Sequence, residues 1–159
     1  MSSVENYIPY QPNAQGFTEA LIDLKSSMGT SSVFKVTGYE AVAFENVVQG
    51  QALYARESDG QVGKASAADG TVENAQVVGF ADADANANTT VKVIVIGLKT
   101  LSGLDAGDLY FLSPSTAGAI TLTPPSSAGQ AVVRVGEAST TTKFAIRIEP
   151  PIKLSWCLV

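Results

Sequence analysis

From Ser32 onward the chain alternates short apolar stretches with turn-forming residues. The alternation is clearest where Phe144, Ile146 and Ile148 fall on one face of an expected strand. Glycine, aspartate and serine gather between the apolar stretches, and these residues favour tight turns. Many short strands at such spacing predict a sandwich or a barrel. The expected strands are 32–44, 52–56, 77–80, 91–96, 109–112, 119–123, 132–135 and 144–148.

The first 30 residues follow a different pattern, in which one apolar stripe predicts a helix. Prolines in the segment 7–13 favour an extended chain before it. Asn13 can cap the helix and Gly29 can end it. A helix this short is marginal alone in water, so it should dock on the β region, on sister copies or on another protein. The stripe consists of Phe17, Ala20, Leu21, Leu24 and Met28.

A repeated arrangement of glycines predicts that the β region is an internal duplication. Gly79 follows Gly50 by 29 positions, and Gly136 follows Gly107 by the same 29. In both copies an aromatic-ended strand follows the first glycine, and the second glycine lies in a valine-rich strand. Glycine inside a strand marks a bulge or a close backbone approach. The alternative is that similar turns coincide by chance in a glycine-rich chain.

Together these patterns predict an all-β fold. We expect a small β-barrel or sandwich built from two similar units, preceded by an extended N-terminal segment and one short helix. Residues 1–30 would form the attachment segment with its helix. Residues 31–159 would form the β domain, with the duplicated units at about 45–100 and 101–154.

Composition narrows the classes of function. The net charge is −5 and the ten basic residues are scattered singly, which disfavours nucleic-acid binding. We expect no membrane insertion and no signal peptide, because no stretch of the sequence has the pattern of either. Histidine is absent and Cys157 is the only cysteine, which disfavours acid–base catalysis near neutral pH and thiolate metal sites.

Two acidic motifs are candidates for metal binding or catalysis. Alternating Asp and Asn side chains in 82–88 resemble a calcium-binding loop, but the glycine and the glutamate of that pattern are replaced by Ala87 and Val93. We therefore expect a solvated, mobile hairpin loop. Asp105 and Asp108 are close in sequence but stand in an expected turn. We predict no enzyme activity, no catalytic, metal-binding or cofactor-binding residues, and no cofactor.

The segment 154–159 is almost entirely apolar. It is expected either to close the barrel as a last strand or to pack on a partner chain. Cys157 would then be a buried small apolar residue, with an intermolecular disulfide as the alternative.

The second unit resembles a known family of proteins. The segments 107–121, 124–125, 132–138 and 150–154 (GDLYFLSPSTAGAIT, PP, VVRVGEA and PPIKL) are similar to a module in tail-fibre and related structural proteins of tailed bacteriophages. The resemblance covers about 45–154. It extends to the small β-barrel proteins that decorate phage capsids, and the N-terminal segments YQPN and ALIDLK resemble the attachment region of short phage fibres.

The resemblance implies a virion protein that forms a homotrimer. The N-terminus would dock on other virion proteins, either of the baseplate and tail or the major capsid protein, while the β region projects outward, where a host surface glycan is a candidate ligand. We expect a short tail fibre, with a capsid decoration protein as the alternative and a carbohydrate-acting enzyme as a remote third hypothesis. The expected attachment and oligomer interface comprises Tyr7, Ile8, Tyr10, Phe17, Leu21, Leu24, Met28 and Trp156.

Overall fold

The structure, a computed structural model, describes residues 37–68 and 70–155. This part of the chain is all-β with one short helix, as predicted. The extended segment and helix predicted in residues 1–30 lie outside the described residues. The elements are β1 (Thr37–Val42), β2 (Ala52–Ala55), β3 (Val62–Lys64), α3 (Val72–Ala75), β4 (Val77–Ala81), β5 (Thr90–Thr100), β6 (Leu109–Leu112), β7 (Ile120–Thr121), β8 (Ala131–Val132), β9 (Arg134–Ala138), β10 (Lys143–Ile146) and β11 (Ile152–Lys153).

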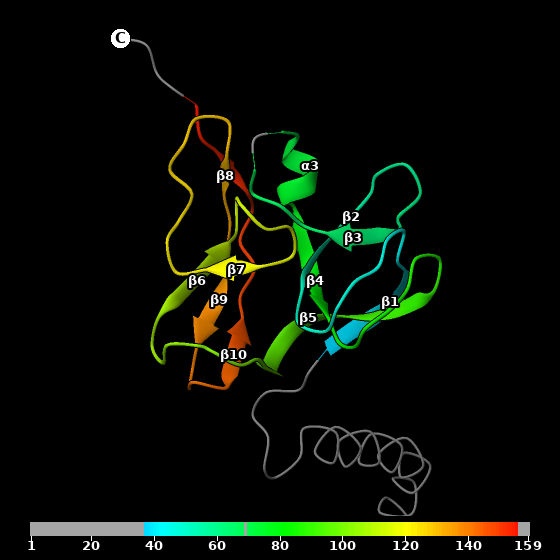
Figure 1. The fold of residues 1–159 in the computed structure, drawn as a ribbon, viewed down its shortest axis with the longest axis horizontal. Coiled ribbons are helices and arrows are strands. Elements are labelled where there is room, and N and C mark those ends of the chain that lie inside the picture. Colours follow the sequence, from blue (N-terminus) through cyan, green and yellow to red (C-terminus); the bar gives the residue numbers. More distant parts are fainter. Residues whose placement is uncertain (1–36, 69, 156–159) are drawn as a thin grey trace, which may run out of the picture. The chain divides into compact units, whose positions relative to one another are not determined.

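Nine of the strands form one curled sheet with the shape of a half-barrel (Figure 1). Their order is β3-β2-β4-β5-β10-β9-β6-β7, with β1 also paired to β5, while β8 and β11 form a separate pair. Backbone bonds beyond the ladders join the two ends of the sheet. Ala67 N donates to Ser113 O at 3.1 Å, and Gly118 N donates to Ala65 O at 2.7 Å. These bonds therefore link the segment after β3 to the segments after β6 and before β7.

The two halves of the sheet have the same strand pairing. In the first half β2 pairs with β3 and β4, and β4 pairs with β5; in the second, β6 pairs with β7 and β9, and β9 pairs with β10. Leu53 lies opposite Gly79, and Tyr110 lies opposite Gly136. Both ladders shift register immediately after these pairs. The glycines that repeat in the sequence therefore occupy equivalent positions in the two ladders.

Strand β5 belongs to both halves. Its residues 90–94 and 96 pair with β1, whereas 97–100 pair with β10. In the second half, the segment 97–100 lies next to β10. This is the position that β1 has next to β5 in the first half. Gly97 has φ +121°, a value that favours glycine, and it stands where the strand changes partners. In Figure 1 the strands of the first half lie on the right and those of the second half on the left.

The main core lies between the halves and takes residues from both. Phe80 and Phe144 are fully buried, with ring centroids 5.5 Å apart in an edge-to-face arrangement. Tyr110 meets Phe144 in the same way at 5.9 Å. Contacts of this kind add to the stabilisation that comes from burial alone. A second, smaller cluster around Leu53, Val62 and Val93 lies within the first half.

The structure differs from the sequence prediction in the shortest elements. Strands β3 and β11 and helix α3 were not predicted, because two to four residues carry too little periodicity to be recognised. Within the described residues, the strand expected at 32–44 ends at Val42, and the chain turns after it. The strand expected at 91–96 continues to Thr100.

Candidate interaction surface

The residues predicted to form the attachment and oligomer interface fall outside the part of the chain that the structure describes. These are Tyr7, Ile8, Tyr10, Phe17, Leu21, Leu24, Met28 and Trp156. The structure therefore neither brings them together nor separates them, and they remain predictions. The candidate surfaces below are built from described residues, which the sequence patterns did not single out.

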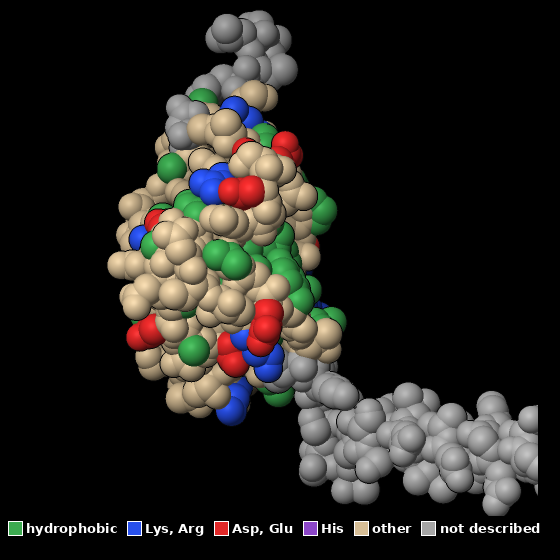
Figure 2. Space-filling view, turned by 90° about the vertical axis from the view of Figure 1, so that its right-hand side faces the viewer, with side chains coloured by type: hydrophobic (Ala, Val, Ile, Leu, Met, Phe, Trp, Pro, Cys, Tyr) green, Lys and Arg blue, Asp and Glu red, His purple; other side chains and the backbone are tan. Residues whose placement is uncertain are grey.

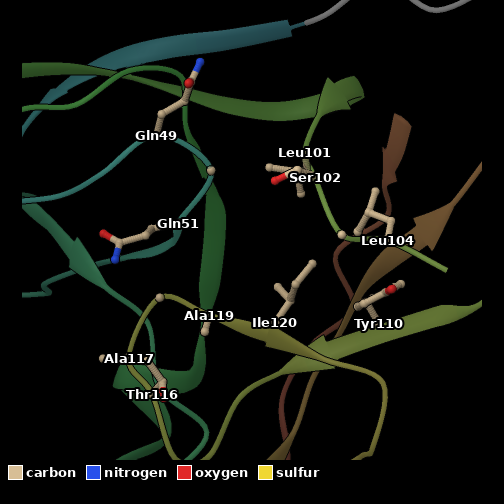
Figure 3. A pocket seen from close by; sticks show the side chains of 13 residues that line it. Gln49, Gln51, Leu101, Ser102, Leu104, Tyr110, Thr116, Ala117, Ala119 and Ile120 are labelled. Atoms are coloured by element: carbon tan, nitrogen blue, oxygen red, sulfur yellow. The ribbon is translucent and has the colours of Figure 1, made fainter. Parts of the chain in front are cut away.

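The largest hollow of these surfaces lies where the two halves meet (Figure 3). It has a volume of about 330 Å³. Three segments form it: 49–51 before β2, 101–104 after β5, and 116–120 leading into β7, together with Tyr110 from β6. The hollow therefore lies where the turn that begins the first repeat meets the segments 101–104 and 116–120.

Two left-handed glycines let these segments approach closely. Gly50 has φ +87°, and a Cβ there would come within 2.7 Å of the Leu101 side chain. Gly118 has φ +80° and packs against the stem of Gln51. Ala52 N donates to Gly118 O at 2.8 Å, which ties the two halves together at this point. The turn glycines of the repeat therefore shape the hollow as well as the chain path.

The lining of the hollow is uncharged. Leu101 and Ile120 both line the hollow, while the amide ends of Gln49 and Gln51 lie at its periphery in Figure 3. Gln51 Oε1 accepts a hydrogen bond from Val48 N, and Gln49 Nε2 donates to Asp82 O. The hollow thus has an apolar centre and a polar rim, an arrangement that binds neutral ligands.

A buried ammonium lies beside this hollow. The Lys99 side chain is 5% exposed, and its Nζ lies 3.4 Å from Asp82 Oδ1. The Asp82 side chain is 43% exposed, so solvent screens only one partner of the pair. Gln49, Leu98 and Thr100 line the small cavity around the pair. This pair joins the end of β5 to the end of β4.

The loop after β4 is an exposed hairpin loop between β4 and β5, as the sequence predicted, and it is also hydrogen-bonded to the 43–51 loop. Val47 and Ala85 exchange two backbone hydrogen bonds of 2.9 and 3.0 Å. Gln49 N donates to Asp84 Oδ1, and Ala87 N donates to Asn46 Oδ1, each at 2.8 Å. Of the oxygens that resembled cation ligands, Asp84 Oδ1 therefore accepts a backbone amide of the 43–51 loop, and Asp82 Oδ1 pairs with Lys99. Among residues 37–68 and 70–155, no three acidic or cysteine side chains gather closely enough to hold a metal ion.

The carboxylates Asp105 and Asp108 occupy an exposed turn. Asp108 N donates to Asp105 O at 3.2 Å, and Asp105 N donates to the Tyr110 hydroxyl at 2.8 Å. Both aspartates stand in a turn, as predicted, and these bonds use their backbone groups rather than their carboxylates.

An aromatic and charged cluster covers the outer side of the first half. The Arg56 guanidinium lies 4.4 Å from the centroid of the Phe44 ring, which packs edge-on to Tyr54 at 5.8 Å. Burial raises the pKa of the Tyr54 hydroxyl, and the nearby carboxylates of Glu73 and Glu45 raise it further. The Tyr54 side chain, which belongs to β2, is therefore neutral within this cluster.

The Arg56 guanidinium also binds the carboxylate of Asp59 in the turn after β2. This hydrogen bond, assisted by the backbone N–H of Gln61, lowers the pKa of Asp59. Both side chains are well exposed, so this pair fixes the turn rather than contributing much stability.

Charged side chains are sparse on the face shown in Figure 2, where they lie singly or in small groups among uncharged ones. Exposed apolar residues occur at the edge strand β1 and the adjoining part of β5. The exposed fractions are 43% for Tyr39, 40% for Val42, 37% for Val95 and 56% for Ile96. Sequence reasoning treated these residues as strand interior, because periodicity alone does not show which strand lies at an edge.

Comparison with models of known protein families and with curated proteins found no match for this chain. Within the described residues, no helix has the length and apolar character that crossing a bilayer requires.

Proposed function

We propose that the protein is a non-enzymatic structural component of the virion of a tailed bacteriophage. The resemblance of the second unit to phage structural modules motivates this assignment. The observation that carries it furthest is the all-β domain, whose two halves have the same strand pairing and whose candidate surfaces offer uncharged contacts and hydrogen-bonded carboxylates rather than an acid–base pair. Such a domain works through its shape and its contacts with other subunits.

Within the virion, we assign the protein to a short trimeric tail fibre attached by its N-terminus. The sequence places a proline-containing segment and an amphipathic stripe before the β domain, which suits an anchor followed by a projecting module. Three copies of the stripe would pair their apolar faces around a threefold axis. The β domain would then face outward, toward the host.

A second position, capsid decoration, is favoured by one specific observation. The β domain buries its core within a single copy, with Phe80, Phe144 and Leu112 fully buried. An intertwined fibre shaft would leave such residues exposed in each separate chain. A self-contained domain suits a protein that clamps the outside of the head.

The location and copy number of the chain in purified particles test both positions. Immunogold labelling should mark one site at the tail for a fibre, or the whole head surface for a decoration protein. Quantitative mass spectrometry of the particles should give a few copies or hundreds of copies, respectively. Absence of the chain from particles purified away from free protein would overturn the virion assignment itself.

A host surface glycan is the candidate ligand if the domain projects outward. The hollow between the halves has an apolar centre formed by Leu101 and Ile120 and a rim with amide and hydroxyl groups, which suits the apolar face and the hydroxyls of a sugar. Ile120→Asp should abolish binding to host cells while Leu122→Asp, at an exposed position outside the lining, should preserve it. Equal binding by both variants would exclude this hollow as the receptor site.

A further inference from the structure

Strand β1 has a free edge. Ala43 N donates to Thr89 O, and this bond continues the β1–β5 register in which Ala41 faces Val91. Hydrogen-bonded and non-bonded pairs alternate in an antiparallel ladder, so the backbone groups of Gly38 and Glu40 point away from β5. Among the described residues, no strand other than β5 pairs with β1. The edge can therefore accept another strand.

Apolar side chains accompany this free edge on one face. The register shifts between Thr37 and Gly38, so that Val95 is the extra residue in β5. A bulge places two residues opposite one, which gathers Val95 and Ile96 on the side of Tyr39. All three are more than one third exposed. Edge strands are usually protected from pairing by charges or prolines, whereas β1 carries only Glu40 and no proline.

The chain itself contains a segment whose pattern matches this edge. In Ser155-Trp156-Cys157-Leu158-Val159, an extended backbone would place Trp156 and Leu158 on one face and three smaller side chains on the other. The large face matches the patch of Tyr39, Val95 and Ile96. The smaller face would lie beside Glu40 and Val42. The segment has no charge to oppose burial.

We propose that residues 155–159 of one copy add as a strand to the free edge of β1 in a second copy. Main-chain hydrogen bonds to Gly38 and Glu40 would supply part of the affinity, and the packing of Trp156 and Leu158 on the exposed patch would supply the rest. The contact joins two different surfaces, so it is head-to-tail and either closes into a ring or continues as a filament. It does not depend on the position of the protein in the virion.

The second copy is favoured over the same chain by reach. Leu154 is fixed by backbone bonds of 2.7 and 2.8 Å that link it to residues 129 and 130. From there residues 155–159 extend at most ~18 Å. Figure 1 places β8, which carries this attachment, and β1 at opposite ends of the β domain. The edge of β1 in the same chain is therefore the less accessible target.

Disulfide trapping tests the proposal, because Cys157 is the only cysteine of the chain. A full-length chain with Glu40→Cys and Cys157→Ser is mixed with tagged wild-type chain and oxidised mildly. Cys157 belongs to the smaller face of the added strand, as does the side chain of Glu40. We therefore expect a mixed disulfide dimer from Glu40→Cys and from Val42→Cys. Ala41→Cys, whose side chain lies on the other face of β1 and outside the apolar patch, is the matched control and should give at least several-fold less dimer.

A second pair of variants separates strand addition from nonspecific contact. Trp156→Ser in the wild-type partner should reduce the trapped dimer at least several-fold. Ile152→Ser, at a 66% exposed position in β11, should leave it unchanged. Equal trapping at positions 40 and 41, or no trapping above that of a Leu122→Cys control, overturns the proposal. Self-trapping of the Glu40→Cys, Cys157→Ser chain would show instead that β1 pairs with another β1.

Discussion

At the scale of single residues, the buried ammonium of Lys99 is the most informative group. Its Nζ is 3.4 Å from Asp82 Oδ1, while the Lys99 side chain is 5% exposed. Removing one partner of a buried pair leaves an uncompensated charge, whereas replacing the charge by an apolar group of similar shape removes the desolvation cost. The effect of a substitution on the stability of the domain should therefore depend on which of the two residues is changed.

We predict that Asp82→Asn destabilises the protein more than Lys99→Met does. Because Asp82 is partly exposed, we expect a loss of ~1–2 kcal/mol for Asp82→Asn and a neutral or stabilising effect for Lys99→Met. Urea denaturation of each variant measures these changes. The double variant should be close to Lys99→Met alone, and independent additive losses would contradict this account.

The repeated glycines give a second prediction at this scale. A Cβ at Gly79 would lie 2.6 Å from Ile94 O, and one at Gly136 would lie 2.2 Å from Ala145 O. Both carbonyls belong to paired backbone that cannot yield easily. Gly79→Ala and Gly136→Ala should therefore each cost ~1–3 kcal/mol of unfolding free energy.

Gly70→Ala is the matched control for these two substitutions, because a Cβ there has no heavy atom within 4 Å. It should be neutral or slightly stabilising in the same urea titrations. Similar midpoints for all three variants would show that the glycines do not act through these close approaches.

At the scale of elements, the loop 43–51 and the loop after β4 stabilise each other. We predict that Asn46→Ala and Asp84→Ala each weaken the contact between these two loops by ~1 kcal/mol, because each removes the acceptor of one backbone amide. Hydrogen exchange of the Val47 and Ala85 amides should become several-fold faster in both variants. Asn86→Ala is the control, since only the Asn86 backbone oxygen accepts bonds here; the same acceleration in that variant would contradict the assignment.

The contact between these two loops also shows why parts of the fold were not predictable from the sequence. Alternating Asp and Asn residues look the same in the sequence whether they face solvent or bind a neighbouring loop, because the partner of Asp84 lies 35 positions away. Strands β2, β4, β6 and β10 were predicted close to their observed bounds, whereas the strand expected at 132–135 is divided between β8 and β9. The glycine spacing predicted equivalent halves because a close approach in a sheet leaves few other residues possible.

At the scale of the whole molecule, the candidate surfaces were the least predictable part. Tyr39, Val95 and Ile96 read as ordinary strand residues, and only the strand order leaves them exposed at an edge. The hollow between the halves likewise depends on which turns meet in space. The N-terminal interface residues remain a prediction from the apolar stripe alone.

The shared core leads to a last prediction, that the two halves unfold as one unit. Phe80 belongs to the first half and Phe144 to the second, yet their rings are in contact and both are fully buried. Strand β5 also continues from one half into the other without a linker. A repeat that buries its apolar face on its neighbour is not stable alone.

Phe80→Leu and Phe144→Leu should therefore each lower one common unfolding midpoint, with a loss of ~1–3 kcal/mol from imperfect repacking of the site. Backbone amide signals from both halves, followed by NMR during urea titration, should disappear together in the wild type and in both variants. Two separate transitions, with each substitution shifting only the transition of its own half, would mean that the duplication has left two independent modules. A single transition would mean that the two halves separate only when the whole domain unfolds. The hollow between them would then keep its shape for as long as the domain is folded.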